Sequence, residues 1–294
     1  MKNKLSWRHH YIPQFYLKGF TNENNEFAIY DKQQNKIKDK LFSPKTHFFE
    51  KNRNIIEIKG EKSDRIETEL YQEIDNDISN LFEEIHNKDA DFLTPYNLYT
   101  LKLFISFLFW RVPKNDELIN EIIDKYDFEE LGFKIQHKTS KKEASEEIKR
   151  MFKNDPAVRK MYSFILPFKT FNVGYNENEE EMWKAISDNT SDAIRLTSDA
   201  PIITLKKDVF YDKTQKIIFP VTSNKLLFYG ETAKQGKLSP NFYIDADVAA
   251  IHNATRYVCG PNKDYLEKVV QLYNLRVEFN KTDEIIPDLF EHLK

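Results

Sequence analysis

Cysteine is almost absent from this chain. Cys259 is the single cysteine among 294 residues, so an intramolecular disulfide is excluded and a zinc site built from several cysteines cannot form. A chain without disulfides is typical of a reducing compartment. The first residues, Met-Lys-Asn-Lys-Leu, are not followed by the apolar segment of a secretory signal. We therefore expect a cytoplasmic protein.

Glycine is also scarce, with 7 residues in the whole chain. Loops that cradle phosphates depend on glycine, because the backbone must approach the ligand closely. Neither GxGxxG nor GxxxxGK[ST] occurs in the sequence. Nucleotide binding by a Rossmann or P-loop mechanism is therefore not expected.

Long hydrophobic runs are missing as well. The longest, residues 101–110, contains Lys102 and Ser106 and is about half the length of a membrane-spanning helix. We expect no membrane partner. A strong excess of one charge is absent too, because 44 basic side chains face 47 acidic ones and the net charge is -3. This balance disfavours a long footprint on duplex DNA, although a local basic patch is compatible with it.

Aromatic residues are abundant, at 14% of the chain, and can fill a core around short strands. The first part, residues 1–62, has the pattern of a small β-rich lobe. Residues 26–30 alternate as a strand and residues 31–35 form a polar turn, so a hairpin returning through Ile37 and Leu41 is predicted. A second pair of strands is expected around residues 46–49 and 55–59.

Residues 63–172 are predicted to form a helical layer. One apolar stripe, at three- and four-residue spacing, consists of Ile66, Leu70, Ile74, Ile78, Leu81, Phe82 and Ile85. Thr94-Pro95 caps a second, buried helix that ends near Arg111. Ser140 with Glu143 has the pattern of a capping box for a helix reaching Phe152, and Asp155-Pro156 begins another helix.

Residues 173–294 form a mixed part in which short strands and helices alternate. The expected strands are residues 193–198, 202–205, 216–221, 226–229 and 256–259, and the expected helices are residues 244–256 and 262–273. The fold class is therefore α+β, with a small N-terminal β-rich lobe, a central helical layer and a C-terminal mixed part. We expect one compact domain with two lobes.

The first candidate site is the pair His9-His10. Imidazole titrates near neutral pH and binds divalent metals, but neighbouring residues on an extended chain point to opposite faces, so one metal cannot easily take both. We expect His10 to face a site, with Gln14 on the same side if the chain turns helical after Pro13. The alternative is that both histidines only pack and form hydrogen bonds within the aromatic lobe.

The second candidate is Asp199, at the end of a predicted strand and stiffened by Pro201. A carboxylate there can act as a general base, bind a metal or pair with a histidine. The alternative is an Asx-turn, in which Asp199 hydrogen-bonds its own backbone. Arg111 and Asn253 are weaker candidates, because a cation at a helix end also fits the helix dipole.

These separated motifs resemble one bacterial family, the domain of unknown function DUF4238. The resemblance rests on five stretches in the same order: Arg8-His9-His10-Tyr11-Ile12-Pro13-Gln14-Phe15-Tyr16-Leu17-Lys18-Gly19-Phe20, Trp110-Arg111-Val112-Pro113, Thr197-Ser198-Asp199-Ala200-Pro201, Phe219-Pro220-Val221-Thr222-Ser223-Asn224-Lys225, and Asn253. The family's pattern more often has asparagine where this chain has Ala200. The resemblance implies no established activity. It does imply that His9, His10, Gln14, Arg111, Asp199 and Asn253 belong to one site.

Two functions follow from such a composite pocket. The first is a nuclease-like hydrolase that cleaves a phosphodiester, with Arg111 on the phosphate, His10 moving the proton, and Asp199 orienting it or holding a divalent metal. Its partner would be a nucleic acid or nucleotide. The second is a non-catalytic sensor or effector of a mobile element or of phage defence, whose polar cluster recognises a ligand or locks the lobes together. The sequence leaves open whether the protein is an enzyme, and which protein partner it has.

Overall fold

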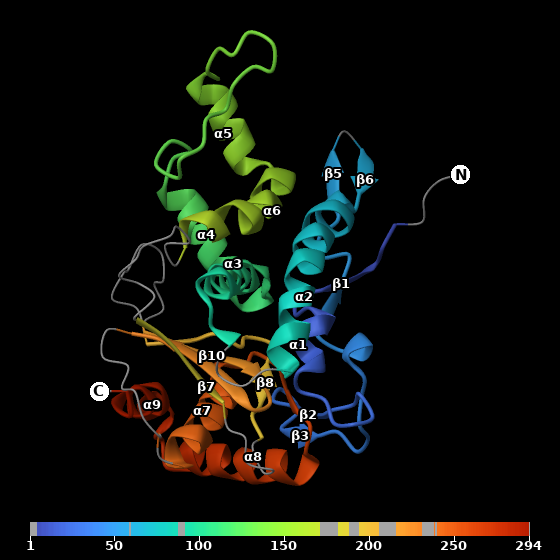
Figure 1. Cartoon of the computed structure of the whole chain (residues 1–294). Helices are drawn as coiled ribbons and strands as arrows, with labels where there is room; N and C mark the ends of the chain where they lie inside the picture. The colour runs from blue at the N-terminus through green and yellow to red at the C-terminus, as the bar shows by residue number, and fades with distance from the viewer. Residues whose placement is uncertain are drawn as a thin grey trace.

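The computed structural model describes residues 5–58, 60–87, 92–170, 182–187, 194–205, 216–230, 238 and 240–293. The fold is α+β, as predicted. Helices α3 to α6 lie above a central sheet and helices α7 to α9 lie below it, with the N-terminal strands beside them (Figure 1).

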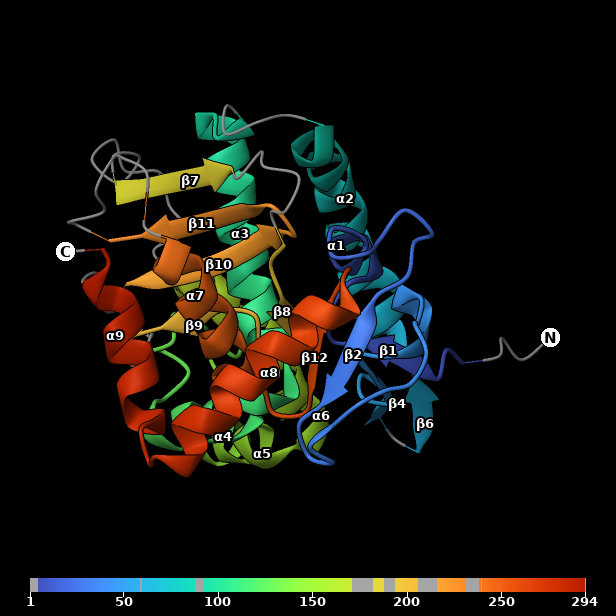
Figure 2. The same cartoon turned by 90° about the horizontal axis from the view of Figure 1, so that it is seen from below.

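The central sheet is antiparallel and has four strands in the described part of the chain. In order they are β7 (Trp183–Ser187), β11 (Lys225–Tyr229), β10 (Ile217–Thr222) and β9 (Ile203–Thr204). Successive side chains alternate between its faces. Ile217 and Phe219 pack in the core that contains α3 (Pro95–Arg111), whereas Ile218 packs in the core that contains α7 (Pro240–Asn253). The sheet therefore separates two hydrophobic cores. Figure 2 shows α7 on one side of the sheet and α3 on the other.

A second four-stranded sheet joins the beginning of the chain to its end. Its order is β3 (Lys36–Ile37), β2 (Ala28–Asp31), β12 (Tyr257–Gly260) and β8 (Thr197–Ser198). The β2–β3 hairpin confirms the predicted strand, turn and return. Because β12 pairs with both β2 and β8, strands from the first 62 residues share one sheet with strands from the last hundred or so.

Two small strand pairs complete the N-terminal region. Strand β1 (Arg8–His10) pairs with β4 (Phe49–Lys51), and β5 (Ile56–Ile58) pairs with β6 (Glu61–Ser63). The expected pairing between residues 46–49 and 55–59 is therefore wrong, because each of these segments finds a different partner. Between β3 and β4 lies a single turn, η1 (Pro44–Thr46).

The helical layer begins where the apolar stripe predicted it. Its elements are the π-helical turn η2 (Ile66–Tyr71), α2 (Gln72–Asn87), α3, η4 (Pro113–Asn115), α4 (Asp116–Lys125), α5 (Glu146–Asn154), α6 (Pro156–Ile165) and η5 (Leu166–Lys169). Thr94 caps α3 by accepting a hydrogen bond from the backbone N–H of Asn97, and Asp155 caps α6. Both caps confirm the sequence prediction.

Helix α5 and the loop before it project from the body (Figure 1), and no residue of α5 is buried. The predicted cap at Ser140 is wrong. Ser145 caps α5 through the N–H of Ile148, while Gln136 and Glu143 form an antiparallel bridge. The loop closes on itself before the helix begins, so Ser140 lies in the turn.

The opening motif becomes the short helix α1 (Gln14–Lys18), which reaches the middle of the molecule. Tyr16 is fully buried and stacks on Phe219 with a centroid distance of 5.4 Å. Its hydroxyl lies 2.8 Å from the Thr197 hydroxyl and donates to the Pro220 carbonyl at 2.7 Å. The Tyr16 side chain of α1 thereby connects β8 to β10. The chain closes with α8 (Lys263–Glu278), η7 (Thr282–Glu284) and α9 (Ile285–Glu291).

Candidate functional site

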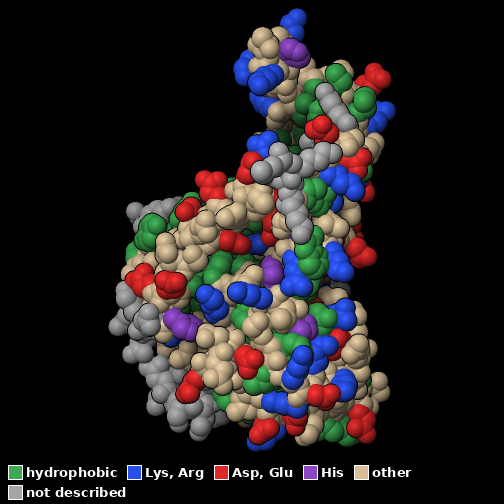
Figure 3. All heavy atoms as spheres, turned by 90° about the vertical axis from the view of Figure 1, so that its right-hand side faces the viewer, with side chains coloured by type: hydrophobic (Ala, Val, Ile, Leu, Met, Phe, Trp, Pro, Cys, Tyr) green, Lys and Arg blue, Asp and Glu red, His purple; other side chains and the backbone are tan. Residues whose placement is uncertain are grey.

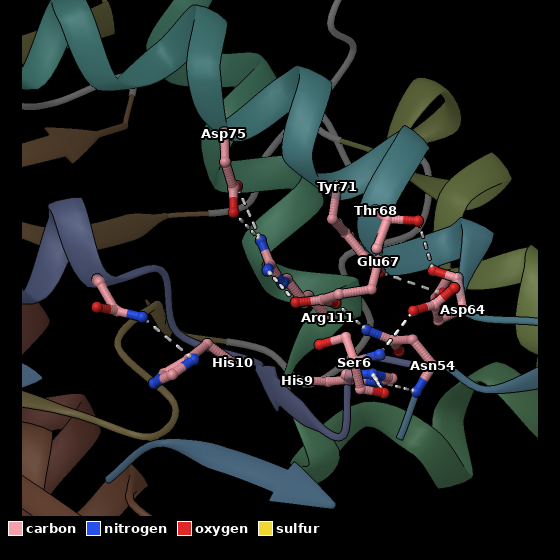
Figure 4. Close-up of polar contacts among 12 residues, drawn as sticks. Ser6, His9, His10, Asn54, Asp64, Glu67, Thr68, Tyr71, Asp75 and Arg111 are labelled. Carbon is pink, nitrogen blue, oxygen red and sulfur yellow. Dashed lines mark hydrogen bonds and ion pairs between the residues drawn. The ribbon is translucent and has the colours of Figure 1, made fainter. Parts of the chain in front are cut away.

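His9 and His10 point to opposite sides of β1, as expected of neighbours on a strand. His9 is fully buried. Its Nδ1 accepts a hydrogen bond of 2.7 Å from the backbone N–H of Asn54, and its Nε2 donates to the Ser6 carbonyl at 3.1 Å. Both ring nitrogens are thus used within the protein. Through these two hydrogen bonds His9 links the N-terminal segment to the turn that contains Asn54 (Figure 4).

His10 lies against Phe49, with ring centroids 5.5 Å apart. The Gln14 amide nitrogen lies 3.5 Å from its Nδ1, so Gln14 shares the face of His10, as predicted. The Nε2 atom of His10 is buried and has no hydrogen-bond partner in the described part of the chain. Burial and the charges of Arg111 and Arg8 lower the pKa of His10 to about 4, although the Pro44 and Lys45 backbones act in the opposite direction. The imidazole is therefore neutral at neutral pH.

Because His10 is buried as a neutral ring, we expect it to make the protein less stable in acid. Its pKa of about 4 in the folded protein lies below the ordinary value of 6.5. Its contribution is therefore complete above about pH 6.5 and is lost as the pH falls toward 4. Urea unfolding should show that His10→Asn removes roughly 2 kcal/mol of the stability loss between about pH 7 and pH 5.

The exposed His137 provides the control for this measurement. His137→Asn makes the same replacement at an exposed position, and its stability is measured over the same pH range. If His10→Asn keeps the wild-type dependence of stability on pH, His10 is not held neutral by its surroundings.

Arg111 is the last residue of α3 and is buried. Its Nη1 donates to both carboxylate oxygens of Asp75, at 2.8 and 2.9 Å, and Nη2 lies 4.0 Å from Glu67. The guanidinium carbon lies 4.2 Å from the centre of the Tyr71 ring. Burial opposes the charge of Arg111, but the two carboxylates raise its pKa. Its Nε is buried and has no hydrogen-bond partner among the residues described.

Asp199 is buried at the end of β8 and binds backbone only. Its Oδ1 accepts from the N–H of Thr255 at 2.9 Å, and its Oδ2 accepts from Arg256 at 2.7 Å and Tyr257 at 3.0 Å. Two of these N–H groups directly precede β12 and the third belongs to its first residue, so none of them lies in the turn of Asp199 itself. The carboxylate thus joins β8 to β12 across more than fifty residues of sequence.

Asn253, the last residue of α7, makes a comparable connection. Its side-chain amide donates to the carbonyls of Ala200 and Ile202, at 2.5 and 2.9 Å. Its side-chain and backbone oxygens accept from Lys114, at 2.5 and 2.7 Å. Asn253 therefore ties the turn after β8 to the connection between α3 and α4.

Five of the six predicted residues fall into two groups by their contacts in the described chain, and His9 belongs to neither. Gln14 contacts His10, and burial together with the charge of Arg111 lowers the pKa of His10. Asp199 and Asn253 connect the segment after β8 to the segment around the end of α7, and burial and the Asp199 charge raise the pKa of Tyr11. His9 faces away from His10. Their catalytic roles stay predictions, and the hydrogen bonds of Asp199 and Asn253 are made within the protein.

A cavity of about 210 Å³ lies beside Arg111. It is lined by Arg53, Asn54, Tyr71, Trp110, Arg111, Asp116, Ile119, Asn120, Arg159, Lys160 and Ser163. Four of these side chains are cationic and one is acidic. Of these residues, only Arg111 was expected from the sequence to belong to a site. The neighbouring cations Arg159 and Lys160 were visible in the sequence, but their convergence with Arg53 depends on the packing of α6 against β5.

Carboxylates hold the arginines of this cavity in place. Arg53 donates to both oxygens of Asp116, at 2.5 and 2.9 Å, and to Glu50 at 2.8 Å. Arg159 donates to Asp124 at 2.7 Å. Lys160 instead donates to the backbone carbonyl of Ile55 at 2.6 Å. Burial and the charge of Arg53 lower the pKa of Lys160, as expected where positive charges are close together.

No group of three or more histidine, cysteine, aspartate or glutamate side chains in the described residues is arranged to hold a metal ion. No helix among these residues has the length and apolar character needed to cross a membrane.

Comparison with known proteins gave one match. The family model described as "Protein of unknown function (DUF4238)" matches residues 8–262, which include all six residues predicted to form a site. No curated protein and no solved structure matches the chain.

Proposed function

Since the chain belongs to the DUF4238 family, whose description gives no activity, we propose a function from the geometry: the protein binds the phosphate group of a nucleotide or nucleic acid in the cavity beside Arg111. The observation that carries this proposal is the buried Arg111 Nε, which lacks a partner in the described chain, on a side chain that lines a cavity with three further cations. Arginine and lysine are the usual partners of phosphate oxygens.

The uncharged polar residues that line the cavity also suit a phosphate group. Asn54, Asn120 and Ser163 add polar groups at the cavity wall. The carboxylates of Asp75 and Glu67 offset part of the positive charge but also hold Arg111 in one orientation. A site whose donors are already oriented loses less conformational entropy when it binds.

Of the two functions expected from the sequence, a ligand-binding sensor or effector fits this cavity better than a nuclease. His10 does not line it, and the Asp199 carboxylate already accepts three backbone hydrogen bonds. Phosphodiester cleavage by His10 and Asp199 stays a prediction from the sequence, and the experiment below includes an assay for it.

Titration calorimetry with inorganic phosphate and with a nucleoside 5′-monophosphate tests the proposal. We expect saturable binding that weakens as salt is added. Lys160→Gln should weaken binding about tenfold, because it removes one charge-assisted hydrogen bond from the phosphate. Lys160 is the variant of choice because its ammonium group donates to a backbone carbonyl, that of Ile55, rather than to a carboxylate.

Lys268, an exposed lysine on α8, is the matched control, and Lys268→Gln should bind like the wild type. The proposal fails if neither ligand binds, or if Lys160→Gln binds as tightly as Lys268→Gln. Labelled single-stranded DNA and RNA incubated with Mg²⁺ provide the cleavage assay. Cleavage by the wild type that disappears in His10→Ala would favour the hydrolase instead.

A further inference from the structure

An exposed tryptophan lies at the start of β1, between two cations. Trp7 is 42% exposed. The guanidinium carbon of Arg8 lies 4.6 Å from the ring centre and the Lys51 ammonium lies 5.6 Å from it. Phe49 contacts the same ring edge-on, at a centroid distance of 6.4 Å. An exposed large aromatic ring beside cations is the combination with which proteins bind single-stranded nucleic acid.

This aromatic surface, made of Trp7, Arg8 and Lys51, is built onto the wall of the phosphate cavity. The backbone N–H of Asn52 donates to the Trp7 carbonyl at 2.9 Å, and Asn54 lines the cavity. Two residues of chain span at most about 7 Å. The Trp7 carbonyl therefore lies within about 10 Å of the Asn54 backbone at the cavity wall.

A polar network fixes this arrangement. Glu67 approaches the Arg111 guanidinium and accepts a hydrogen bond of 2.7 Å from the Asn54 side chain. The Asn54 backbone in turn donates to His9, which donates to Ser6. Figure 4 shows these residues as one chain of contacts from Arg111 to the segment preceding Trp7. The buried His9 thus positions the aromatic surface relative to the cavity.

We propose that the aromatic surface stacks a base of a single-stranded nucleic acid whose phosphate lies in the cavity. This second proposal rests on the proposed phosphate binding and adds the class of ligand, a single-stranded nucleic acid. Stacking on Trp7 gives affinity with little sequence preference, and Arg8 and Lys51 face the neighbouring phosphates. Figure 3, which views the molecule from the side of β1, shows lysine and arginine side chains at several places on this face, with acidic ones between them. The bases of a duplex are paired and stacked on each other, so they cannot stack on such a ring.

Fluorescence quenching provides the direct test. The other two tryptophans, Trp110 and Trp183, are buried, so a base that stacks on the protein surface should quench Trp7. The probes are a short oligothymidylate with a 5′-phosphate, a duplex of the same length, and inorganic phosphate alone. We expect quenching and the tightest binding with the single strand. Trp7→Ala should weaken its binding about tenfold more than it weakens phosphate binding, while Trp7→Phe retains most of the affinity.

The outcomes separate the two proposals. If phosphate binds but Trp7→Ala and Trp7→Phe bind the oligothymidylate like the wild type, base stacking on Trp7 is overturned and phosphate binding stands. If the duplex binds as tightly as the single strand, the assignment to single strands is overturned. If phosphate and oligothymidylate both fail to bind, the proposed function itself falls. Circular dichroism of each variant shows that the fold is retained.

Discussion

Replacement of Asp199 by asparagine should lower the free energy of unfolding by about 3 kcal/mol, because three backbone N–H groups lose part of their buried acceptor. The carboxylate accepts from the backbones of Thr255, Arg256 and Tyr257. An asparagine of the same shape has one acceptor oxygen, and its NH₂ group would face at least one of these donors. Urea unfolding at neutral pH measures the loss.

Asp39 offers the matched control, since its side chain is 89% exposed and its salt bridge is to Lys36 on the surface. Asp39→Asn should leave the unfolding midpoint almost unchanged. An Asp199→Asn variant as stable as Asp39→Asn would mean that water or a rearranged backbone satisfies the three N–H groups. The connection between β8 and β12 would then not depend on this carboxylate.

Local signals in the sequence predicted helix ends well. Thr94-Pro95 and Asp155-Pro156 each place a side-chain acceptor directly before a proline, and both caps form as expected. A cap depends on a few consecutive residues, so the sequence contains most of the information. Ser140 shows the limit of this argument. The same type of pattern is present, but the bridge between Gln136 and Glu143 takes the segment into a turn.

Strand pairing could not be predicted in the same way. The segments that become β4 and β5 were recognisable as strands, but their partners, β1 and β6, depend on how the chain folds back. The pairing of β12 with β2 brings together residues separated by more than two hundred positions, and β12 also pairs with β8. The alternation of apolar and polar residues along a strand predicts which of its faces is buried. It says little about which strand pairs with it.

The candidate site shows the same difference between local contacts, which the sequence predicts, and contacts between distant segments, which it does not. The sequence predicted that His9 and His10 diverge and that Gln14 joins His10, because these relations follow from backbone geometry over six residues. It did not identify Arg53 or Lys160, whose side chains line the cavity from distant elements. Nor did it predict that Asp199 accepts hydrogen bonds from residues beyond position 250. Such contacts depend on tertiary packing.

Removal of the buried cation at Arg111 should have the other large effect. Arg111→Met keeps much of the side-chain volume but leaves the carboxylates of Asp75 and Glu67 close together without their partner. Breaking a buried ion pair from one side costs about 3 kcal/mol or more. Urea unfolding should show this loss, and phosphate binding should disappear, because Arg111 lines the cavity and its Nε has no partner in the described chain.

A double-mutant cycle with Asp75→Asn shows whether the cost arises from the unpaired carboxylate. Because each single variant leaves a charge without its partner, the double variant should be more stable than the sum of the two losses predicts. Arg65→Met is the control: Arg65 pairs with Glu69 at 2.8 Å, but its side chain is 72% exposed, so little change is expected. If the Arg111 and Asp75 losses simply add, the pair does not stabilise the wall of the cavity. Arg111 would then be held by packing on Tyr71, and its role in phosphate binding would not depend on the carboxylates.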